Sequence, residues 1–177
     1  MARAFTHFII CDVAKRKRSI SDPELRKLLN RLSEFLFLGA ASPDLPYLSF
    51  KTGRVNWADV MHYEKTNGIA IHGHNELKDV CTTKQTADKI KLIWLFGYVS
   101  HLVADATIHP VVQAIVGPYD QNEQTKTEHR ICEMTQDALI YNERKNTDIR
   151  YAEFSSALKF FRKSNDLMGR FYLLEFS

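Results

Sequence analysis

The sequence has few of the residues that mark several common classes of metal and redox protein. Its three cysteines, Cys11, Cys81 and Cys132, are an odd number without a Cys-x-x-Cys spacing. This argues against a disulfide framework and against a thiolate zinc site. No histidine is followed directly by aspartate, the pair that HD-type phosphohydrolases need, and no paired Glu-x-x-His motifs indicate a ferritin-like di-iron protein.

Charge and hydropathy argue against two further classes. The 24 basic and 21 acidic residues leave a net charge of +3, a surplus too small to indicate a nucleic-acid-binding protein. No run of about 18 apolar residues is free of charge, and the N-terminal sequence MARAFTHFIICDVAKRKR lacks the order of a secretory signal. We therefore expect a cytoplasmic protein without a membrane-spanning segment.

Helical patterns dominate the chain, whose 177 residues suit one domain. The spacing of apolar residues predicts helices over 3–15, 23–38, 57–66, 86–108, 128–144, 150–163 and 166–176. Residues 69–82 fit either a helix or a loop. The sequence thus predicts an all-α fold, a helical bundle formed by residues 1–177 as a single domain.

Several residues suggest where these helices begin and end, and which way one of them faces. Ser21 or Asp22 can cap the second helix and Asn56 the third, and Gly39 is expected to end the second. The helix over 128–144 is expected to turn its apolar residues toward the core: Ile131, Met134, Ala138 and Leu139.

The most apolar stretch, LFGYVSHLVADATIHPVV at residues 95–112, carries three polar residues at intervals of four: His101, Asp105 and His109. In a helix these residues form one slanted stripe. An unpaired carboxylate in apolar surroundings costs several kcal/mol, so Asp105 must either pair with the histidines or bind a metal ion. This helix alone leaves both possibilities open.

Other histidines and carboxylates accompany this stripe in separate parts of the chain. His129 and Glu133 lie four apart in EHRICE, and Asp44 lies between two prolines in SPDLPY. His7 and His62 occur in largely apolar surroundings, whereas His72 and His74 lie in a polar stretch and are expected at the surface. Imidazole and carboxylate ligands without thiolates suit hydrolytic zinc.

These motifs resemble a known family when they are taken in their order along the chain. LFGYVSHLVADATIHP, the preceding GAASPDLPY loop and the later His-x-x-x-Glu are similar to the pattern of the zinc-dependent phospholipase C family. The family belongs to a superfamily with single-strand-specific nucleases, and it resembles the N-terminal domain of glycosylphosphatidylinositol-specific phospholipase D. The similarity covers roughly residues 5–142, and it depends on the whole set of motifs.

The resemblance implies an all-α domain with three zinc ions in a cleft. One zinc would be held by Asp44, His62, His101 and Asp105, and a second by His109, His129 and Glu133. His7 and Asp105 would hold the third, so that Asp105 bridges two ions. In relatives the third ion also binds the N-terminal residue, usually Trp. No Trp precedes His7 here, so we expect two or three zinc ions.

The function implied is zinc-dependent hydrolysis of phosphodiesters, with Asp44 also accepting a proton from the attacking water. The expected partner is a phosphodiester substrate such as a phospholipid, reached by transient contact with a membrane surface, and no stable nucleic-acid complex is expected. Two alternatives stay open: a non-catalytic zinc-binding helical protein, and a nuclease-type phosphodiesterase on the same scaffold. The oligomeric state is left open.

Overall fold

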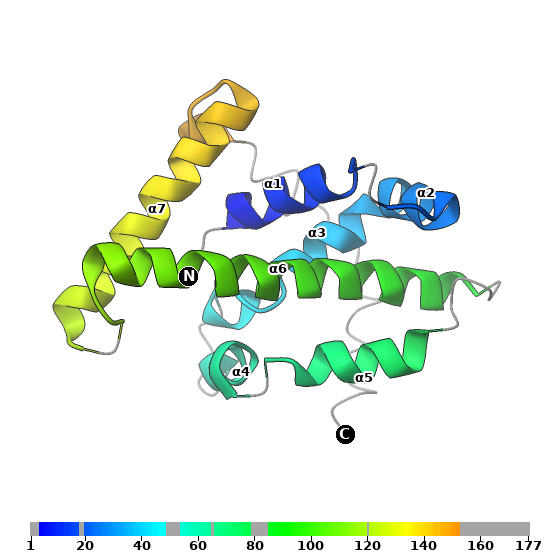
Figure 1. Ribbon diagram of the computed structural model, residues 1–177, viewed down its shortest axis with the longest axis horizontal. Helices are drawn as coiled ribbons and strands as arrows, with labels where there is room; N and C mark the ends of the chain where they lie inside the picture. Colours follow the sequence, from blue (N-terminus) through cyan, green and yellow to red (C-terminus); the bar gives the residue numbers. More distant parts are fainter. Residues whose placement is uncertain are drawn as a thin grey trace.

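The computed structural model of this chain consists of helices (Figure 1). It describes residues 4–17, 20–48, 54–64, 66–78, 85–119 and 121–152. Over these residues there is no strand, and the α-helices are α1 (Ala4–Ala14), α2 (Pro23–Arg31), α3 (Ser33–Ala41), α4 (Arg54–Asp59), α5 (Gly68–Leu77), α6 (Thr86–Val116) and α7 (Glu123–Lys145). The predicted all-α fold is confirmed, and the extent of the single domain over residues 1–177 stays a prediction.

Three short helical turns complete the described chain. The 3-10 turns are η1 (Leu45–Leu48) and η4 (Ile149–Tyr151), and η2 (Val60–Glu64) is a π-helical turn that directly follows α4. A π-helical turn is rare and occurs often at functional sites. Apart from η4, the two predicted C-terminal helices lie outside the described residues.

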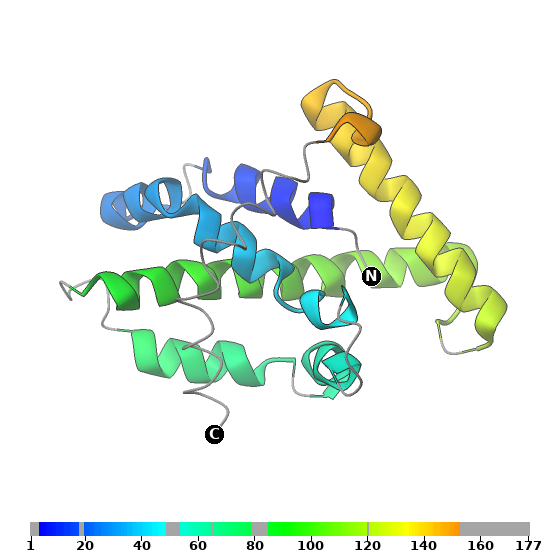
Figure 2. The same ribbon diagram turned by 180° about the vertical axis from the view of Figure 1, so that it is seen from behind.

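Helix α6 is the 31-residue axis around which the other helices are arranged. In both views α1 and α2 lie on one side of α6 and α4 and α5 lie on the other, while α3 crosses α6 (Figures 1 and 2). Helix α7 crosses the C-terminal end of α6 and rises on the side of α1 (Figure 1). By length and composition α6 could also cross a membrane, which is weak evidence because core helices of globular proteins meet the same criteria.

Two glycines allow α3 and α6 to cross with their backbones in contact. A Cβ atom on Gly39 would lie 1.9 Å from the carbonyl oxygen of Trp94, and one on Gly97 would lie 1.9 Å from that of Leu36. The prediction that Gly39 ends its helix is wrong, because α3 continues to Ala41. Gly39 serves the contact with α6 and is not a helix end.

The predicted second helix forms as two helices, α2 and α3, which pack with α1 and α6 around a core cluster. Asp22 caps α2, since its side chain accepts hydrogen bonds from the backbone N–H groups of Glu24 and Leu25. The predicted second helix is divided at Leu32 into α2 and α3. The buried residues of this cluster are Cys11, Leu28, Leu29, Leu36, Ala40 and Ile93.

Several helix ends differ from the predicted positions, and α7 begins at Glu123, five residues before its predicted start. Helix α4 begins at Arg54, so Asn56 lies inside it and does not cap it. Helix α6 continues past its predicted end to Val116, with Pro110 inside it. Proline removes one backbone hydrogen bond from a helix, but Val112, beyond the proline, is fully buried. This packing offsets the loss and keeps the last turns helical.

The prediction for the buried face of α7 is wrong. Ile131, Met134 and Leu139 are 57%, 52% and 65% exposed. The buried residues of this helix are the polar ones at intervals of four: Thr125, His129, Glu133 and Asp137. The apolar pattern was misleading because α7 is packed through hydrogen-bonding and ionisable side chains.

Candidate metal centre

Two imidazoles face each other at the middle of the bundle. His101 lies on α6 and His62 lies on η2, and their Nε2 atoms are 3.2 Å apart. The other ring nitrogen, Nδ1, donates a hydrogen bond to a backbone carbonyl in each case, to Ala40 at 2.7 Å from His101 and to Ala58 at 2.7 Å from His62. A neutral imidazole has only one N–H. When both rings are neutral, both Nε2 atoms therefore present lone pairs to one another.

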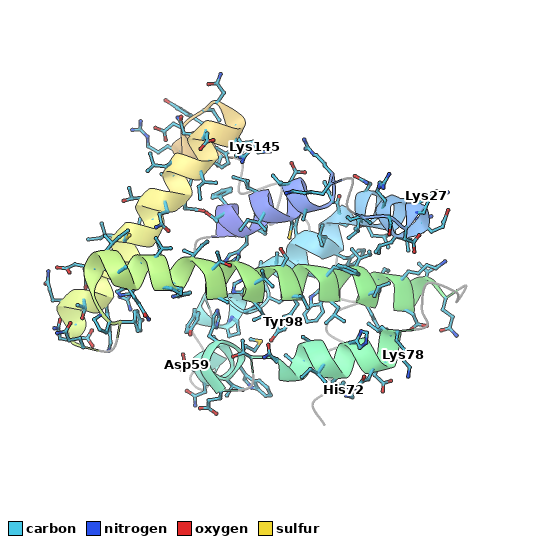
Figure 3. All side chains as sticks on the ribbon, viewed as in Figure 1. Lys27, Asp59, His72, Lys78, Tyr98 and Lys145 are labelled. Atoms are coloured by element: carbon cyan, nitrogen blue, oxygen red, sulfur yellow. The ribbon has the colours of Figure 1, made fainter. Side chains whose placement is uncertain are left out.

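The packing around Tyr98 brings these two rings together. Tyr98 is fully buried and points from α6 toward the side that α4 and α5 cover (Figure 3). Its hydroxyl donates to the carbonyl of Thr66 at 3.4 Å, and the Thr66 hydroxyl donates to the carbonyl of His62 at 3.1 Å. Since Tyr98 lies about one turn before His101 on α6, these bonds hold η2 against the ligand face of that helix.

Two carboxylates complete the surroundings of the facing nitrogens. Oδ1 of Asp44, in the turn after α3, lies 3.4 Å from Nε2 of His62. Oδ2 of Asp105 lies 3.1 Å from Nε2 of His101 and 3.7 Å from Nε2 of His62. A tetrahedron with metal–ligand bonds of about 2.0 Å has edges of about 3.3 Å. The separations among these atoms that involve His62 and His101, 3.1–3.7 Å, are close to such an edge, as expected for ligands of one metal ion.

His7 of α1 lies against the face of the His101 ring, next to the same centre. The rings of His7 and His101 are stacked, with centroids 3.9 Å apart and an interplanar angle of 16°. Nε2 of His7 lies 3.5 Å from Oδ1 of Asp105. Burial, together with His101, lowers the pKa of His7 to about 4, so the ring is neutral near pH 7 and can bind a metal ion.

The charges at the centre favour an ionised carboxylate beside the imidazoles. Burial by itself raises the pKa of Asp105, but hydrogen bonds with His101 and His109 outweigh it and hold that pKa well below its usual range. Burial by itself lowers the pKa of His62. The interaction with Asp44 is the largest of the effects that outweigh burial, so the pKa of His62 is raised. The site thus attracts a positive charge, either a proton or a metal cation.

The residues of the predicted second zinc site are less closely gathered. His109 on α6 lies between two carboxylates, with Nε2 3.7 Å from Oδ2 of Asp105 and Nδ1 3.9 Å from Oε1 of Glu133. His129 donates from Nε2 to the carbonyl of Gly117 at 2.6 Å, which leaves Nδ1 as the atom able to bind a metal ion. This Nδ1 is buried and has no hydrogen-bond partner.

Two groups of potential metal ligands are compact. In each group one ligand atom per residue lies within 4.8 Å of the others: His7, His101 and Asp105 in the first, and Asp44, His62 and His101 in the second. Within the described part of the chain, the set of His109, His129 and Glu133 does not form a group of this kind. The assignment of all eight residues as zinc ligands stays a prediction.

Buried polar atoms without hydrogen-bond partners collect at this centre. They are Nδ1 and Nε2 of His7, Oδ1 of Asp44, Oδ1 of Asp105 and Nδ1 of His129. Such atoms are rare because each costs about 1–3 kcal/mol when it is left unsatisfied. Coordination of metal ions would satisfy them, which supports a metal-binding role for these residues.

The centre is closed around His101 and in partial contact with solvent at Asp44, Asp105 and His109. The side chain of His101 is fully buried, whereas those of Asp105, Asp44 and His109 are 12%, 16% and 28% exposed. Water can therefore reach the centre from the side of these three residues. His72 and His74 are exposed on α5, as predicted, and His72 points outward (Figure 3).

The sequence did not identify the groups that orient the imidazoles. These groups are the backbone carbonyls of Ala40, Ala58 and Gly117, and a carbonyl leaves no mark in a sequence. Hydrogen bonds of this kind fix the tautomer of a metal-binding histidine and the orientation of its ring. Three of the five candidate histidines are held in this way.

Comparison with protein families gives one match over nearly the whole chain. The family model for zinc dependent phospholipase C covers residues 6–174. The chain belongs to the zinc-dependent phospholipase C family. No curated protein and no solved structure gave a match.

Membership in the zinc-dependent phospholipase C family agrees with the chemistry of the donor set. Each of the two compact groups combines two imidazoles with one carboxylate, and no thiol takes part, which are ligands typical of catalytic zinc. The free cysteines among the described residues, Cys11 and Cys132, belong to neither group. The side chains present therefore fit the metal that the family name implies.

Proposed function

We propose that this protein hydrolyses phosphodiesters of the phospholipid type with two or three zinc ions. The observation that carries the proposal is the 3.2 Å approach of two Nε2 atoms, each on a ring whose Nδ1 donates to a carbonyl. Two lone pairs at this distance repel one another unless a proton or a metal ion lies between them, and the unpartnered buried atoms of His7 and Asp44 favour the metal ion. The proposed ligands are His7, Asp44, His62, His101, Asp105, His109, His129 and Glu133.

Bound zinc would supply two effects, namely hydroxide from water near neutral pH and positive charge beside the phosphoryl oxygens. The side chains of the protein have separate tasks. Asp44 is in partial contact with solvent, with 16% of its side chain exposed, and we assign it as the acceptor of the proton of the attacking water. Asp105 directs its two oxygens to different histidines, which suits a bridging ligand.

Two aromatic side chains, one beside His62 and one on α4, support the proposal of a lipid-like substrate. The ring of Tyr47 lies 5.6 Å from that of His62, and Trp57 on the neighbouring α4 is 49% exposed. Aromatic side chains with one exposed face suit the boundary between a lipid headgroup and its acylglycerol. We propose a transient contact with a membrane surface, and a cytoplasmic location in which internal lipids or small phosphodiesters are the substrates.

The first test is hydrolysis of bis-p-nitrophenyl phosphate by the zinc-loaded protein. We expect turnover that is abolished by a chelator and restored by zinc. The release of phosphocholine from phosphatidylcholine vesicles, compared with cleavage of single-stranded DNA, then separates the phospholipase from the nuclease activity. Glu143→Gln, a change of an exposed residue on α7, serves as a control with unchanged activity.

The same experiment distinguishes catalysis from a structural use of zinc. A non-catalytic zinc protein would bind the metal and melt at a lower temperature after chelation, without turnover of any phosphodiester. A folded, zinc-loaded protein that leaves the whole panel of substrates intact would contradict the proposed activity. A protein that binds no zinc would contradict the metal centre itself.

A further inference from the structure

A buried carboxylate outside the proposed ligand set joins helices α1 and α7, which are far apart in the sequence. Oδ1 of Asp137, on α7, accepts one hydrogen bond from the backbone N–H of Thr6 at 2.6 Å and a second from the Thr6 hydroxyl at 2.7 Å. Both residues are 3% exposed. The contact spans 131 positions of the chain and connects α7 with the first turn of α1.

This contact provides a hydrogen-bond acceptor for a backbone N–H group in the first turn of α1. The first N–H groups of a helix have no partners within it, and they carry a partial positive charge. Helix α1 begins at Ala4, so the N–H of Thr6 is one of these groups. Asp137 satisfies it with a carboxylate from another helix, in the manner of an N-cap.

The residue that follows Thr6 is the candidate ligand His7. Its ring lies against His101 and Asp105 of α6, and neither of its nitrogens has a hydrogen-bond partner. No carbonyl therefore orients the ring of His7, in contrast to His62, His101 and His129. The position of His7 depends on how α1 is held, and Asp137 holds α1 one residue away.

Helix α7 depends on the same contact because its apolar side chains lie at the surface. Ile131, Met134 and Leu139 are more than half exposed. Asp137 follows Glu133 by four residues on the buried stripe, and one turn further along the ring of Tyr141 meets that of Phe5 at 5.0 Å. The Thr6–Asp137 contact is thus central to the packing of α7 against α1.

We infer that Asp137 is a positioning residue that fixes the position of His7 at the metal centre. It does so by joining α1, which carries His7, to α7, which carries His129 and Glu133. The metal-binding part of this inference rests on the proposed function. The packing part does not, since it concerns where the ring of His7 lies in the metal-free protein.

The test measures the accessibility of His7 without using metal or activity. Metal-free protein is treated with diethylpyrocarbonate, and the modified histidines are located by mass spectrometry. His7 and His101 are both at most 1% exposed, so both are protected in the natural chain. In Asp137→Ala we expect the modification of His7 to be at least ten times faster, while His101 stays protected.

Matched variants separate positioning from general unfolding. Thr6→Val removes the hydroxyl and keeps the backbone bond, so we expect a smaller increase at His7, and Thr6→Ser restores protection. Glu143→Gln, on the exposed side of the same helix, changes nothing. His7 that stays protected in Asp137→Ala would overturn the inference, and so would His7 and His101 reacting in parallel. If Asp137→Ala does not fold, Thr6→Val gives the same comparison.

Zinc release then tests the link to the metal centre. We expect Asp137→Ala to release one ion at least ten times faster to a chromophoric chelator, and His7→Ala to release the same ion with no further effect of Asp137→Ala. Independent effects of the two substitutions would overturn the link to His7. A natural chain without zinc would contradict the proposed function, and the histidine modification would still decide whether Asp137 positions His7.

Discussion

Asp105 turns one carboxylate oxygen, Oδ1, toward Nε2 of His7 at 3.5 Å, and the other, Oδ2, toward Nε2 of His101 at 3.1 Å. His7 and His101 are stacked and belong to different helices. A single carboxylate thus faces two separate directions from the centre of α6, as a residue shared by two metal ions must do.

Replacement of Asp105 tests this sharing directly. Asp105→Asn keeps the shape of the side chain and removes its charge, and we expect the zinc content to fall by more than one ion per chain. Elemental analysis of the purified protein provides the measurement. Asp88→Asn, in the first turn of the same helix, is the control. A loss of one ion or of none would show that Asp105 does not bridge.

Asp44 is expected to matter more for turnover than for metal content. Asp44→Asn keeps an oxygen that can bind zinc, but a neutral amide cannot accept the proton of the attacking water. We expect kcat to fall by about 10²–10⁴-fold, the usual contribution of general base catalysis, with less than one ion lost per chain. Equal activity of this variant and the natural chain would exclude Asp44 as the base.

The crossing of α3 and α6 connects the stability of the fold with the metal centre. Gly97→Ala places a Cβ atom 1.9 Å from the Leu36 carbonyl and 2.8 Å from the N atom of Ala40, and the carbonyl of Ala40 orients His101. We expect the free energy of unfolding to fall by about 3 kcal/mol, as measured by urea denaturation, with weaker zinc binding.

Gly73→Ala is the matched control for this crossing. Its Cβ atom would meet only the tip of the Leu95 side chain, at 2.9 Å, which can rotate away. Alanine also favours helix by about 1 kcal/mol over glycine. We expect this variant to remain within about 1 kcal/mol of the natural chain. A similar loss in both variants would contradict the backbone contact as the cause.

His7 gives the metal-free protein a defined dependence on pH. Its pKa is about 4 in the fold, chiefly because it is buried, and about 6.5 in the unfolded chain. Between these values the unfolded chain binds more protons. Stability is therefore fully present above pH 6.5 and is lost as the pH falls, by about 1.4 kcal/mol per pH unit from this residue.

The difference between the natural chain and His7→Gln isolates this effect. Urea denaturation of chelated protein at pH 7, 6 and 5 should show a steeper loss of stability for the natural chain. The raised pKa of His62 acts with the opposite sign, since its contribution is lost as the pH rises, but it is present in both proteins. Parallel curves would show that the pKa of His7 is not lowered in the folded protein.

Local spacing predicted those parts of the fold and site that depend on neighbouring turns of a helix. The four-residue intervals in residues 101–109 place Asp105 Oδ2 3.1 Å from His101 and 3.7 Å from His109. The Asp22 cap follows equally local chemistry. Such contacts are determined by helix geometry alone, so a sequence is sufficient to predict them.

Features that depend on distant parts of the chain could not be predicted in this way. Gly39 has the local character of a helix end, yet its role is set by Trp94 on another helix. The apolar residues of α7 predicted the wrong buried face, because the partners of that helix are polar groups such as Thr6. The π-helical turn that carries His62 had no recognisable pattern either.

His101 belongs to both compact ligand groups, yet its Nε2 has one electron pair to give. The two groups therefore compete for that atom, and a metal ion bound in one group leaves the other group without His101 as a ligand. Successive ions would then be taken up with unequal affinity, and the order of loading would be decided at this one ring.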